Sequence, residues 1–368
     1  MENNCDFVKT KSLCPSCLKV IEATIFKKRG QLYISKTCPE HGTYEALHPL
    51  DIPQQYAEIQ RIFRIDSEIY AKPRDLILYI TNRCNQNCPI CYNDAKKKYL
   101  KEPTREEILE KISGYRGEYV HLSGGEHALR EDIFEIIQAI RKKGFRVGLF
   151  SNGKKLTDKS YVKKLKKSGV NLVILQFDSL DDVDYLLMRK EKLLQIKLKA
   201  VENLKNFRIP VYLFAVVVKD INTDQIGKLV KFALDNSEVV KILNFNPVWE
   251  IGRNNGFNRV SNTEIYREIE KQTGIKLEEF LQQTELSHYL FELYSKLFRA
   301  FLNEDWVRQP ACAQRVYVVK TEKEGVAINR IIDIPRLIEY LRILDTFDDR
   351  GKINNLWRLF WRLPMGFC

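Results

Sequence analysis

The chain has 368 residues, of which 44% are hydrophobic and 29% are charged. This composition excludes a disordered protein and provides enough apolar material for about two globular domains. No run of 18 apolar residues occurs, and the segment from Met1 to Asp6 lacks the apolar core of a secretory signal, so we expect a cytoplasmic protein. The net charge of +12 favours either an acidic partner or a lysine-rich solvated surface.

The cysteines are concentrated in two clusters. The nine cysteines are Cys14, Cys17 and Cys38 near the N-terminus, then Cys84, Cys88 and Cys91, and the isolated Cys5, Cys312 and Cys368. Cysteine pairs separated by two residues, in a chain without a secretory signal, are typical of metal binding rather than of a disulfide framework.

Residues 1–50 are predicted to form a small metal-binding ribbon. Strand-like runs at Val20–Phe26 and Leu32–Ser35 flank a turn at Arg29 and Gly30. The candidate ligands have the spacing C-x2-C-x20-C-x2-H and are Cys14, Cys17, Cys38 and His41. Such a set binds one zinc or one mononuclear iron. His41 has an alternative as fourth ligand in Cys5 or a more distant cysteine.

A helix is predicted over residues 51–72, linking the ribbon to an α/β domain at residues 73–260. In this domain short β-branched runs alternate with amphipathic helical patterns. The expected strands are Asp75–Thr81, Tyr119–Ser123, Val147–Ser151, Leu172–Asp178, Val211–Val218 and Val240–Phe245. The expected helices are Arg105–Ile112, Asp132–Lys143, Asp158–Lys167, Lys190–Asn206 and Asp224–Asn236. Six successive β–α units predict a parallel sheet whose chemistry lies at the carboxyl ends of the strands.

Residues 261–368 are predicted to be mostly helical. We expect a long helix at Leu277–Asn303, a hairpin within Val316–Ile332 and a helix at Pro335–Leu344. The last segment, residues 356–363, is aromatic and basic. Such a segment is typical of contact with an anionic membrane surface or of packing in a core.

Cys84, Cys88 and Cys91 directly follow the first strand of the α/β domain, with the spacing C-x3-C-x2-C. Three thiolates on one loop bind three irons of a [4Fe–4S] cluster and leave the fourth iron free to bind a small molecule. A zinc site is the alternative, but three cysteines on so short a loop rarely complete a tetrahedral zinc site alone.

The segment from Thr81 to Tyr92 resembles the signature of the radical S-adenosylmethionine (SAM) superfamily, and the resemblance extends from Pro73 to Val248. It implies a partial (β/α)6 barrel and a [4Fe–4S] cluster whose open iron binds SAM. One electron from the cluster, supplied by an external donor, then cleaves SAM to a 5′-deoxyadenosyl radical. This radical abstracts hydrogen from an unactivated carbon.

Further motifs follow the next strands in the order that the resemblance requires. The residues that it implies for SAM binding are Gly124, Gly125, Glu126, Ser151, Asn152, Gln176, Asp178 and Arg189. Gly124 to Glu126 resemble a GGE motif that accepts hydrogen bonds from the SAM ammonium, and Arg189 resembles an arginine that pairs with the SAM carboxylate. Val217 and Val218 are expected to pack against adenine. His127 departs from the pattern, because relatives usually carry proline there.

The cysteine-rich N-terminus and the segment from Asn246 to Arg253 resemble one group within this superfamily, which contains the archaeal tetraether lipid synthase and the radical SAM pterin methylases. The resemblance implies lipid carbon–carbon coupling or methylation, acting on a lipid or a small molecule. Members of the group are longer and carry further cysteines, so we expect this chain to be shortened or one part of a split protein. We expect Cys312 to be an ordinary buried cysteine.

Two other functions are consistent with parts of the sequence. A basic protein with a CxxC ribbon fits a radical SAM enzyme that modifies RNA, but no basic and aromatic face stands out in the ribbon, so we do not expect nucleic acid as a partner. A non-catalytic iron–sulfur protein would not need the GGE and Ser-Asn-Gly motifs. The sequence assigns no catalytic residue beyond the cofactor ligands.

Overall fold

The computed structural model describes residues 8–48, 75–96, 101–249, 252–254, 256–283, 285–286, 318–320, 325–327 and 333–345. The predicted linker helix at 51–72, the basic tail at 356–363 and Cys312 lie outside the described residues. Within those that are described, no helix is long and apolar enough to cross a membrane.

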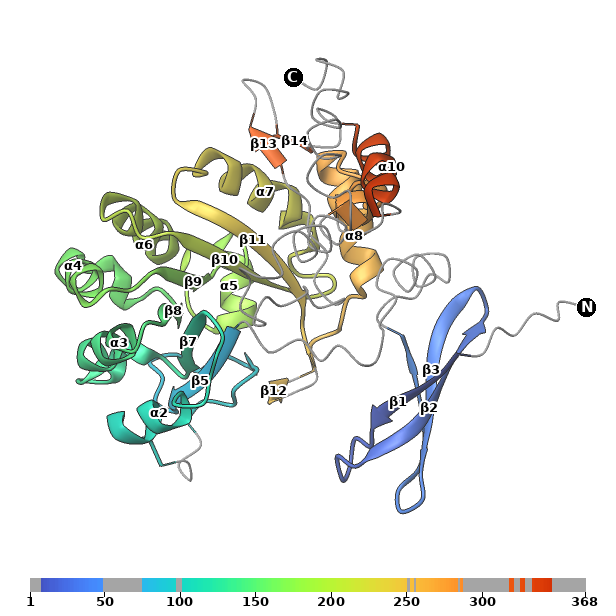
Figure 1. Cartoon of the computed structure of the whole chain (residues 1–368), viewed down its shortest axis with the longest axis horizontal. Helices are drawn as coiled ribbons and strands as arrows, with labels where there is room; N and C mark the ends of the chain where they lie inside the picture. The colour runs from blue at the N-terminus through green and yellow to red at the C-terminus, as the bar shows by residue number, and fades with distance from the viewer. Residues whose placement is uncertain are drawn as a thin grey trace, which may run out of the picture.

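The N-terminal ribbon is a four-stranded antiparallel sheet (blue in Figure 1). Its strands, in spatial order, are β1 (Val8–Leu13), β2 (Val20–Lys28), β3 (Gln31–Cys38) and β4 (Gly42–Leu47). The turn between β2 and β3 has Arg29 and Gly30 at positive φ, as a two-residue hairpin requires. The two central strands agree with the prediction from the sequence, whereas the outer two were not predicted, because their side chains are mostly exposed.

The central domain is built on a six-stranded parallel sheet, as the sequence predicts. Its strands are β5 (Asp75–Thr81), β7 (Tyr119–Gly124), β8 (Arg146–Ser151), β9 (Leu172–Gln176), β10 (Val211–Val217) and β11 (Val240–Pro247). The spatial order is β11-β10-β9-β8-β7-β5, so the strands follow one another across the sheet. Within the described part of the chain, β5 and β11 are its two edges, which is the arrangement of an open (β/α)6 barrel.

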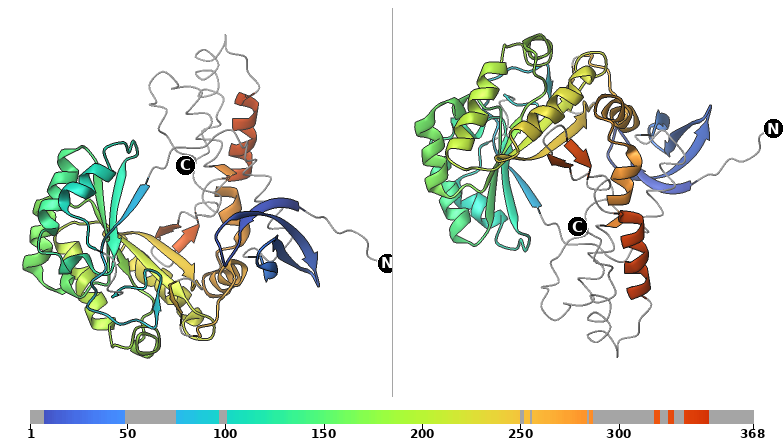
Figure 2. Two further views of the ribbon diagram at one scale, coloured as in Figure 1. Left: turned by 90° about the horizontal axis from the view of Figure 1, so that it is seen from below. Right: turned by 90° about the horizontal axis from the view of Figure 1, so that it is seen from above.

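Helices cover one face of this sheet (Figure 2). They are α2 (Arg105–Lys111), α3 (Ile133–Lys142), α4 (Lys159–Ser168), α6 (Leu194–Asn206) and α7 (Ile226–Asp235). Between the helices and the sheet lies the main core, where residues such as Leu122, Ile137 and Leu149 are fully buried. Burial of this apolar surface is the main stabilising term for the layer.

The predicted helix at Lys190–Asn206 is confirmed as α6, which begins at Leu194, and a further helix that was not predicted, α5 (Asp182–Arg189), precedes it. The Asp181 side chain accepts from the Val183 N–H at 2.8 Å and begins α5 eight residues before the predicted start. Lys190 lies in the left-handed region at φ 63° and ends α5, and α6 begins only at Leu194. Arg189 is therefore the last residue of α5.

Two short strands connect the two edges of the large sheet. β6 (Ile90–Cys91) follows β5, β12 (Arg253–Asn254) follows β11, and the two pair antiparallel with Arg253 opposite Cys91. Segments from opposite ends of the sheet therefore meet beside the loop that carries the second cysteine cluster.

The C-terminal region adds α8 (Asn262–Thr273), β13 (Val318–Lys320), β14 (Gly325–Ala327) and α10 (Ile334–Asp345). The pairing of β13 with β14 confirms the predicted hairpin, and α10 confirms the predicted helix. Residues 277–283, 285 and 286 are helical, which agrees with the start of the predicted helix at Leu277–Asn303, whose remainder lies outside the described residues.

Candidate functional site

The second cysteine cluster lies on the loop between β5 and β6. The thiols of Cys84, Cys88 and Cys91 are free and half-buried, and the Ala95 N–H donates to Cys91 Sγ at 3.4 Å. Burial raises the pKa of the Cys84 thiol. Among the described residues, the three sulfur atoms do not lie close enough together to bind one metal ion, whereas the ligand atoms of the ribbon do. Half-buried sulfurs on one loop fit a cluster better than a lone ion.

The glycines of the GGE motif bring β7 against the cysteine loop. The Gly125 N–H donates to Thr81 O and the Glu126 N–H to Arg83 O, both at 2.8 Å. A Cβ at Gly124 would lie 2.1 Å from Thr81 O, and one at Gly125 would lie 2.0 Å from Arg83 O. Only glycine permits this approach, so the pair fixes the start of the loop that carries the cysteines.

Glu126 joins the ends of β7 and β8. Its side chain is fully buried, and its carboxylate accepts from Ser151 Oγ at 3.0 Å and from the Asn152 N–H at 2.8 Å. His127 Nε2 lies 3.6 Å from Glu126 Oε1, and burial lowers the pKa of His127 despite this neighbour. The histidine that replaces the usual proline is therefore a buried side chain within the turn.

Arg189 and Asp178 form a buried ion pair. Arg189 donates from Nε and Nη2 to the two carboxylate oxygens of Asp178, at 2.8 and 3.1 Å. Burial alone would lower the pKa of Arg189, but Asp178 and Cys88 outweigh it and raise that pKa. Arg189 Nη1 also donates to Ile90 O at 3.2 Å, so the guanidinium reaches the cysteine loop.

Lys197 is a residue of the site that the sequence analysis missed. It lies on α6, is fully buried, and donates from Nζ to Asn152 O at 2.6 Å and to Gln176 Oε1 at 2.7 Å. Burial lowers its pKa to about 7. The signal was present in the sequence, because Lys197 shares a helix face with the apolar Ala200, Val201 and Leu204, all of which are buried.

These contacts form a continuous polar network around the carboxyl ends of the strands. Gln176 Nε2 donates to Asp178, and Asn152 Nδ2 donates to Asn85 Oδ1 at 2.7 Å in the cysteine loop. Six of the eight residues that the resemblance implies for SAM binding belong to this network: Glu126, Ser151, Asn152, Gln176, Asp178 and Arg189. The other two, Gly124 and Gly125, directly precede Glu126. Of the two valines, Val217 packs with Ile226 in a second core, whereas Val218 packs with Ile90 and Met188, the chain neighbours of Cys91 and Arg189.

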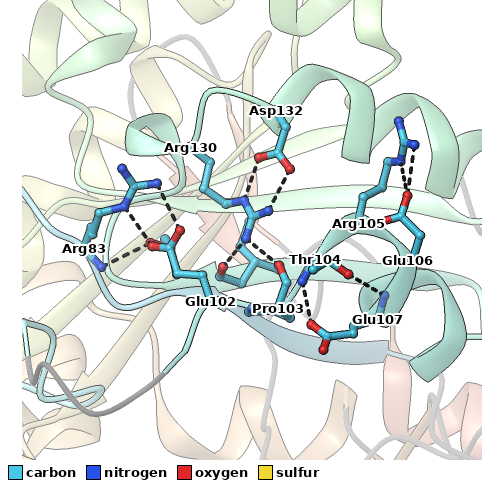
Figure 3. A network of polar contacts seen from close by, with 11 residues as sticks. Arg83, Glu102, Pro103, Thr104, Arg105, Glu106, Glu107, Arg130 and Asp132 are labelled. Atoms are coloured by element: carbon cyan, nitrogen blue, oxygen red, sulfur yellow. Dashed lines mark hydrogen bonds and ion pairs between the residues drawn. The ribbon is translucent and has the colours of Figure 1, made fainter.

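A second polar network lies where β5 leads into the cysteine loop and includes Arg83, a residue of that loop (Figure 3). Arg83 makes two bonds to the Glu102 carboxylate, at 2.8 and 3.0 Å. Arg130 is 6% exposed and donates from Nη1 to Ile80 O at 2.7 Å and to Pro103 O at 2.9 Å. These bonds fix the end of β5 against the segment that begins α2.

The ribbon brings its four predicted ligands together. The ligand atoms of Cys14, Cys17, Cys38 and His41 all lie within 4.8 Å of one another. Cys38 Sγ lies 3.4 Å and Cys14 Sγ 3.8 Å from His41 Nδ1. Three sulfurs and one imidazole nitrogen suit a tetrahedral metal ion, so the donor set fits the zinc or mononuclear iron that the spacing predicts.

Comparison with known proteins gives two family matches. Residues 78–233 match the radical SAM superfamily, and residues 7–48 match the HMPTM N-terminal zinc ribbon domain. The chain is 32% identical to 7,8-dihydro-6-hydroxymethylpterin dimethyltransferase of Methanocaldococcus jannaschii, over 94% of this chain and 74% of that protein.

More distant relatives cover less of the chain. A probable GTP 3′,8-cyclase of Pyrococcus abyssi is 30% identical over 46% of this chain and 56% of its own length. Among solved structures, Streptococcus suis SuiB matches with a TM-score of 0.43 and 18% identity, covering 68% of this chain and 51% of that one.

Proposed function

Because this chain belongs to the radical SAM superfamily, as its similarity to the pterin dimethyltransferase over most of both chains shows, we propose that it methylates a carbon of a reduced pterin or a closely related heteroaromatic molecule. It is an enzyme that uses a [4Fe–4S] cluster and SAM. When bound, the cluster supplies the electron that cleaves SAM reductively. The methylation and its substrate are the proposal.

Cys84, Cys88 and Cys91 are the proposed cluster ligands. Support comes from their position on one half-buried loop at the carboxyl end of β5 and from the Ala95 N–H that donates to Cys91 Sγ. The backbone bonds from Gly125 and Glu126 hold this loop in place. Three ligands leave one iron without a protein thiolate, which is the position that SAM requires.

The polar strand ends are the proposed SAM site. Asp178 orients Arg189 through two bonds, and Arg189 lies beside the cysteine loop, where its charge favours the SAM carboxylate. Lys197 orients Gln176, and Glu126 orients Ser151 and Asn152. In this arrangement Glu126 and Asp178 act mainly by orienting their neighbours, since both carboxylates are fully buried.

The face of the sheet opposite the helices favours a flat aromatic substrate over an alkyl chain. Val120 and Leu122 belong to the core under the helices, so Tyr119 and His121 face the other way. The Tyr119 and His121 rings stack with centroids 5.5 Å apart, and Phe150 meets His121 edge-on at 6.2 Å. Phe150 in turn meets Phe214 edge-on at 6.3 Å. An aromatic row of this kind binds planar rings well.

Cys14, Cys17, Cys38 and His41 are proposed to bind one zinc with a structural role. The ribbon buries few apolar side chains, among them Ala23, Ile25 and Leu32, so it needs the metal to hold its fold.

The proposal is tested with the full chain, reconstituted anaerobically with iron and sulfide and supplied with a reductant and methyl-labelled SAM. One SAM molecule is cleaved to the radical and methionine, and a second SAM molecule donates its methyl group, with the remaining electron coming from the reductant. We expect label to enter 7,8-dihydro-6-hydroxymethylpterin, detected by mass spectrometry, and not an isoprenoid lipid or an RNA offered in parallel. Replacing His121 with Ala should lower methylation while leaving iron content unchanged. Label in the lipid or the RNA, with none in the pterin, would show that the substrate assignment is wrong.

A further inference from the structure

Arg253 is the residue of β12 that lies opposite Cys91 in the β6–β12 pair. It comes from the chain segment after β11, whereas Cys91 comes from the segment after β5, at the other edge of the sheet. Gly252 makes the approach feasible, because a Cβ there would lie 2.3 Å from Cys91 O. The sequence around Arg253 is therefore built to reach the cysteine loop.

All the contacts that the structure shows for the Arg253 side chain go to the segment from residue 87 to residue 95. Its Nη1 donates to Asn87 Oδ1 at 2.9 Å and to Cys88 O at 3.2 Å. Its Nη2 donates to Ala95 O at 2.8 Å, and its Nε lies 3.3 Å from Asp94 Oδ1. One guanidinium thus holds the loop both before and after Cys91.

The turn that Arg253 holds is conformationally unfavourable. Asp94 has φ 45° and Lys96 has φ 79°, the left-handed region that side chains disfavour. Such a turn persists only where its surroundings fix it. The turn presents the Ala95 N–H to Cys91 Sγ at 3.4 Å. Hydrogen bonds to ligand sulfur and nearby positive charge both raise the reduction potential of an iron–sulfur cluster.

We propose that Arg253 is a positioning residue for the cluster: it holds the Cys91–Lys96 turn so that the Ala95 N–H bonds to Cys91 Sγ, and it thereby raises the reduction potential of the cluster. This rests on the proposed assignment of Cys91 as a cluster ligand. The change in potential comes from the four contacts of the Arg253 guanidinium together. The positive charge of Arg253 contributes less by itself, since the Asp94 carboxylate, 3.3 Å from Arg253 Nε, neutralises much of it.

The test compares Arg253→Gln, Arg253→Lys and Asp94→Asn in the full, anaerobically reconstituted chain, with the midpoint potential followed by electron paramagnetic resonance. Arg253→Gln should move the potential to more negative values, and Arg253→Lys should move it less in the same direction. Asp94→Asn keeps the other Arg253 contacts, so the potential should stay or rise. Arg105→Gln, which removes an exposed ion pair with Glu106, is the control and should cause no shift.

Hydrogen exchange of the protein before iron loading provides a readout that does not depend on the cluster. The peptide that spans residues 91–96 should exchange faster in Arg253→Gln than in the wild type, while the peptides of β8 stay unchanged. If Arg253→Gln binds no iron, this exchange and the Arg253→Lys potential decide the question.

Wild-type potential and exchange in Arg253→Gln would overturn the proposal, as would equal shifts in Arg253→Gln and Asp94→Asn. A failure of the ligand assignment is recognised separately, because Cys91→Ala would then keep the full iron content.

Discussion

At the scale of single residues, Lys197 carries a clear pH dependence. Burial lowers its pKa to about 7 in the folded protein, while an unfolded lysine titrates near its ordinary value of about 10.4. The unfolded chain therefore binds more protons between these values, so this residue makes stability rise with pH across that window. The penalty below the folded pKa is on the order of 4 kcal/mol.

Replacing Lys197 with Met should remove this residue's contribution to the rise of stability with pH. In urea titrations of the full chain, wild-type stability should gain more than that of the variant between about pH 7 and pH 9. The variant also leaves Asn152 O and Gln176 Oε1 without their donor, so it should bind SAM more weakly, by roughly tenfold for 1.4 kcal/mol lost. Parallel stability curves for the two proteins would contradict the assignment.

Gly125 provides a steric prediction. A methyl group at Gly125 would meet the backbone oxygen of Arg83 at 2.0 Å, and the backbone there has little room to shift. Gly125→Ala should cost about 1–3 kcal/mol in the free energy of unfolding and reduce the iron bound on reconstitution. Gly114→Ala is the matched control, since nothing lies within 4 Å of its added methyl. Equal stability and iron content in the two variants would contradict this role.

The sequence predicts site residues where the chemistry depends on local spacing. Cys84, Cys88 and Cys91, and the glycines before Glu126, are recognised from neighbours along the chain. The contacts of Lys197 and Arg253 depend on how distant segments meet, since Arg253 bonds to Asn87 and Cys88 across more than half of the domain. The bidentate bond of Arg189 to Asp178 joins residues 11 apart in the chain, whereas the bond of Arg189 to Ile90 O spans 99 residues and depends on the fold.

At the scale of elements, the strands of the barrel are predicted well, because each contains a run of apolar residues that is buried under the helices. The outer ribbon strands β1 and β4 are not, because most of their residues are exposed and their pattern is weak. The predicted start of α6 at Lys190 is four residues early, because Lys190 adopts the left-handed region, which nothing in its residue type indicates.

The ribbon should depend on its metal. A strong zinc chelator, or Cys38→Ser, should unfold residues 8–48 and leave the barrel folded, because the two regions have separate buried clusters. Two-dimensional NMR or limited proteolysis would show the loss of ribbon signals alone. Ser16→Ala, which alters a neighbour of the ligands, is the control and should keep the ribbon folded. An intact ribbon without metal would contradict the structural role.

At the scale of the whole molecule, the parallel sheet gathers loops from distant parts of the chain at one end. The cysteine loop, the GGE motif, Asn152, Gln176 and Arg253 lie at or just after the ends of five different strands, and they meet because parallel strands point the same way. The pairing of β6 with β12 connects the two edges of the sheet at this end. The assembled site is therefore a property of the complete barrel.

The proposed function depends on a cluster, held by Cys84, Cys88 and Cys91, that cleaves SAM. The most direct test is to incubate the anaerobically reconstituted chain with SAM and a strong reductant and to measure 5′-deoxyadenosine. We expect 5′-deoxyadenosine from the wild type, and none from Cys88→Ala prepared in the same way. A wild-type protein that carries the full cluster and binds SAM yet forms no 5′-deoxyadenosine, or an equally active Cys88→Ala, would contradict it.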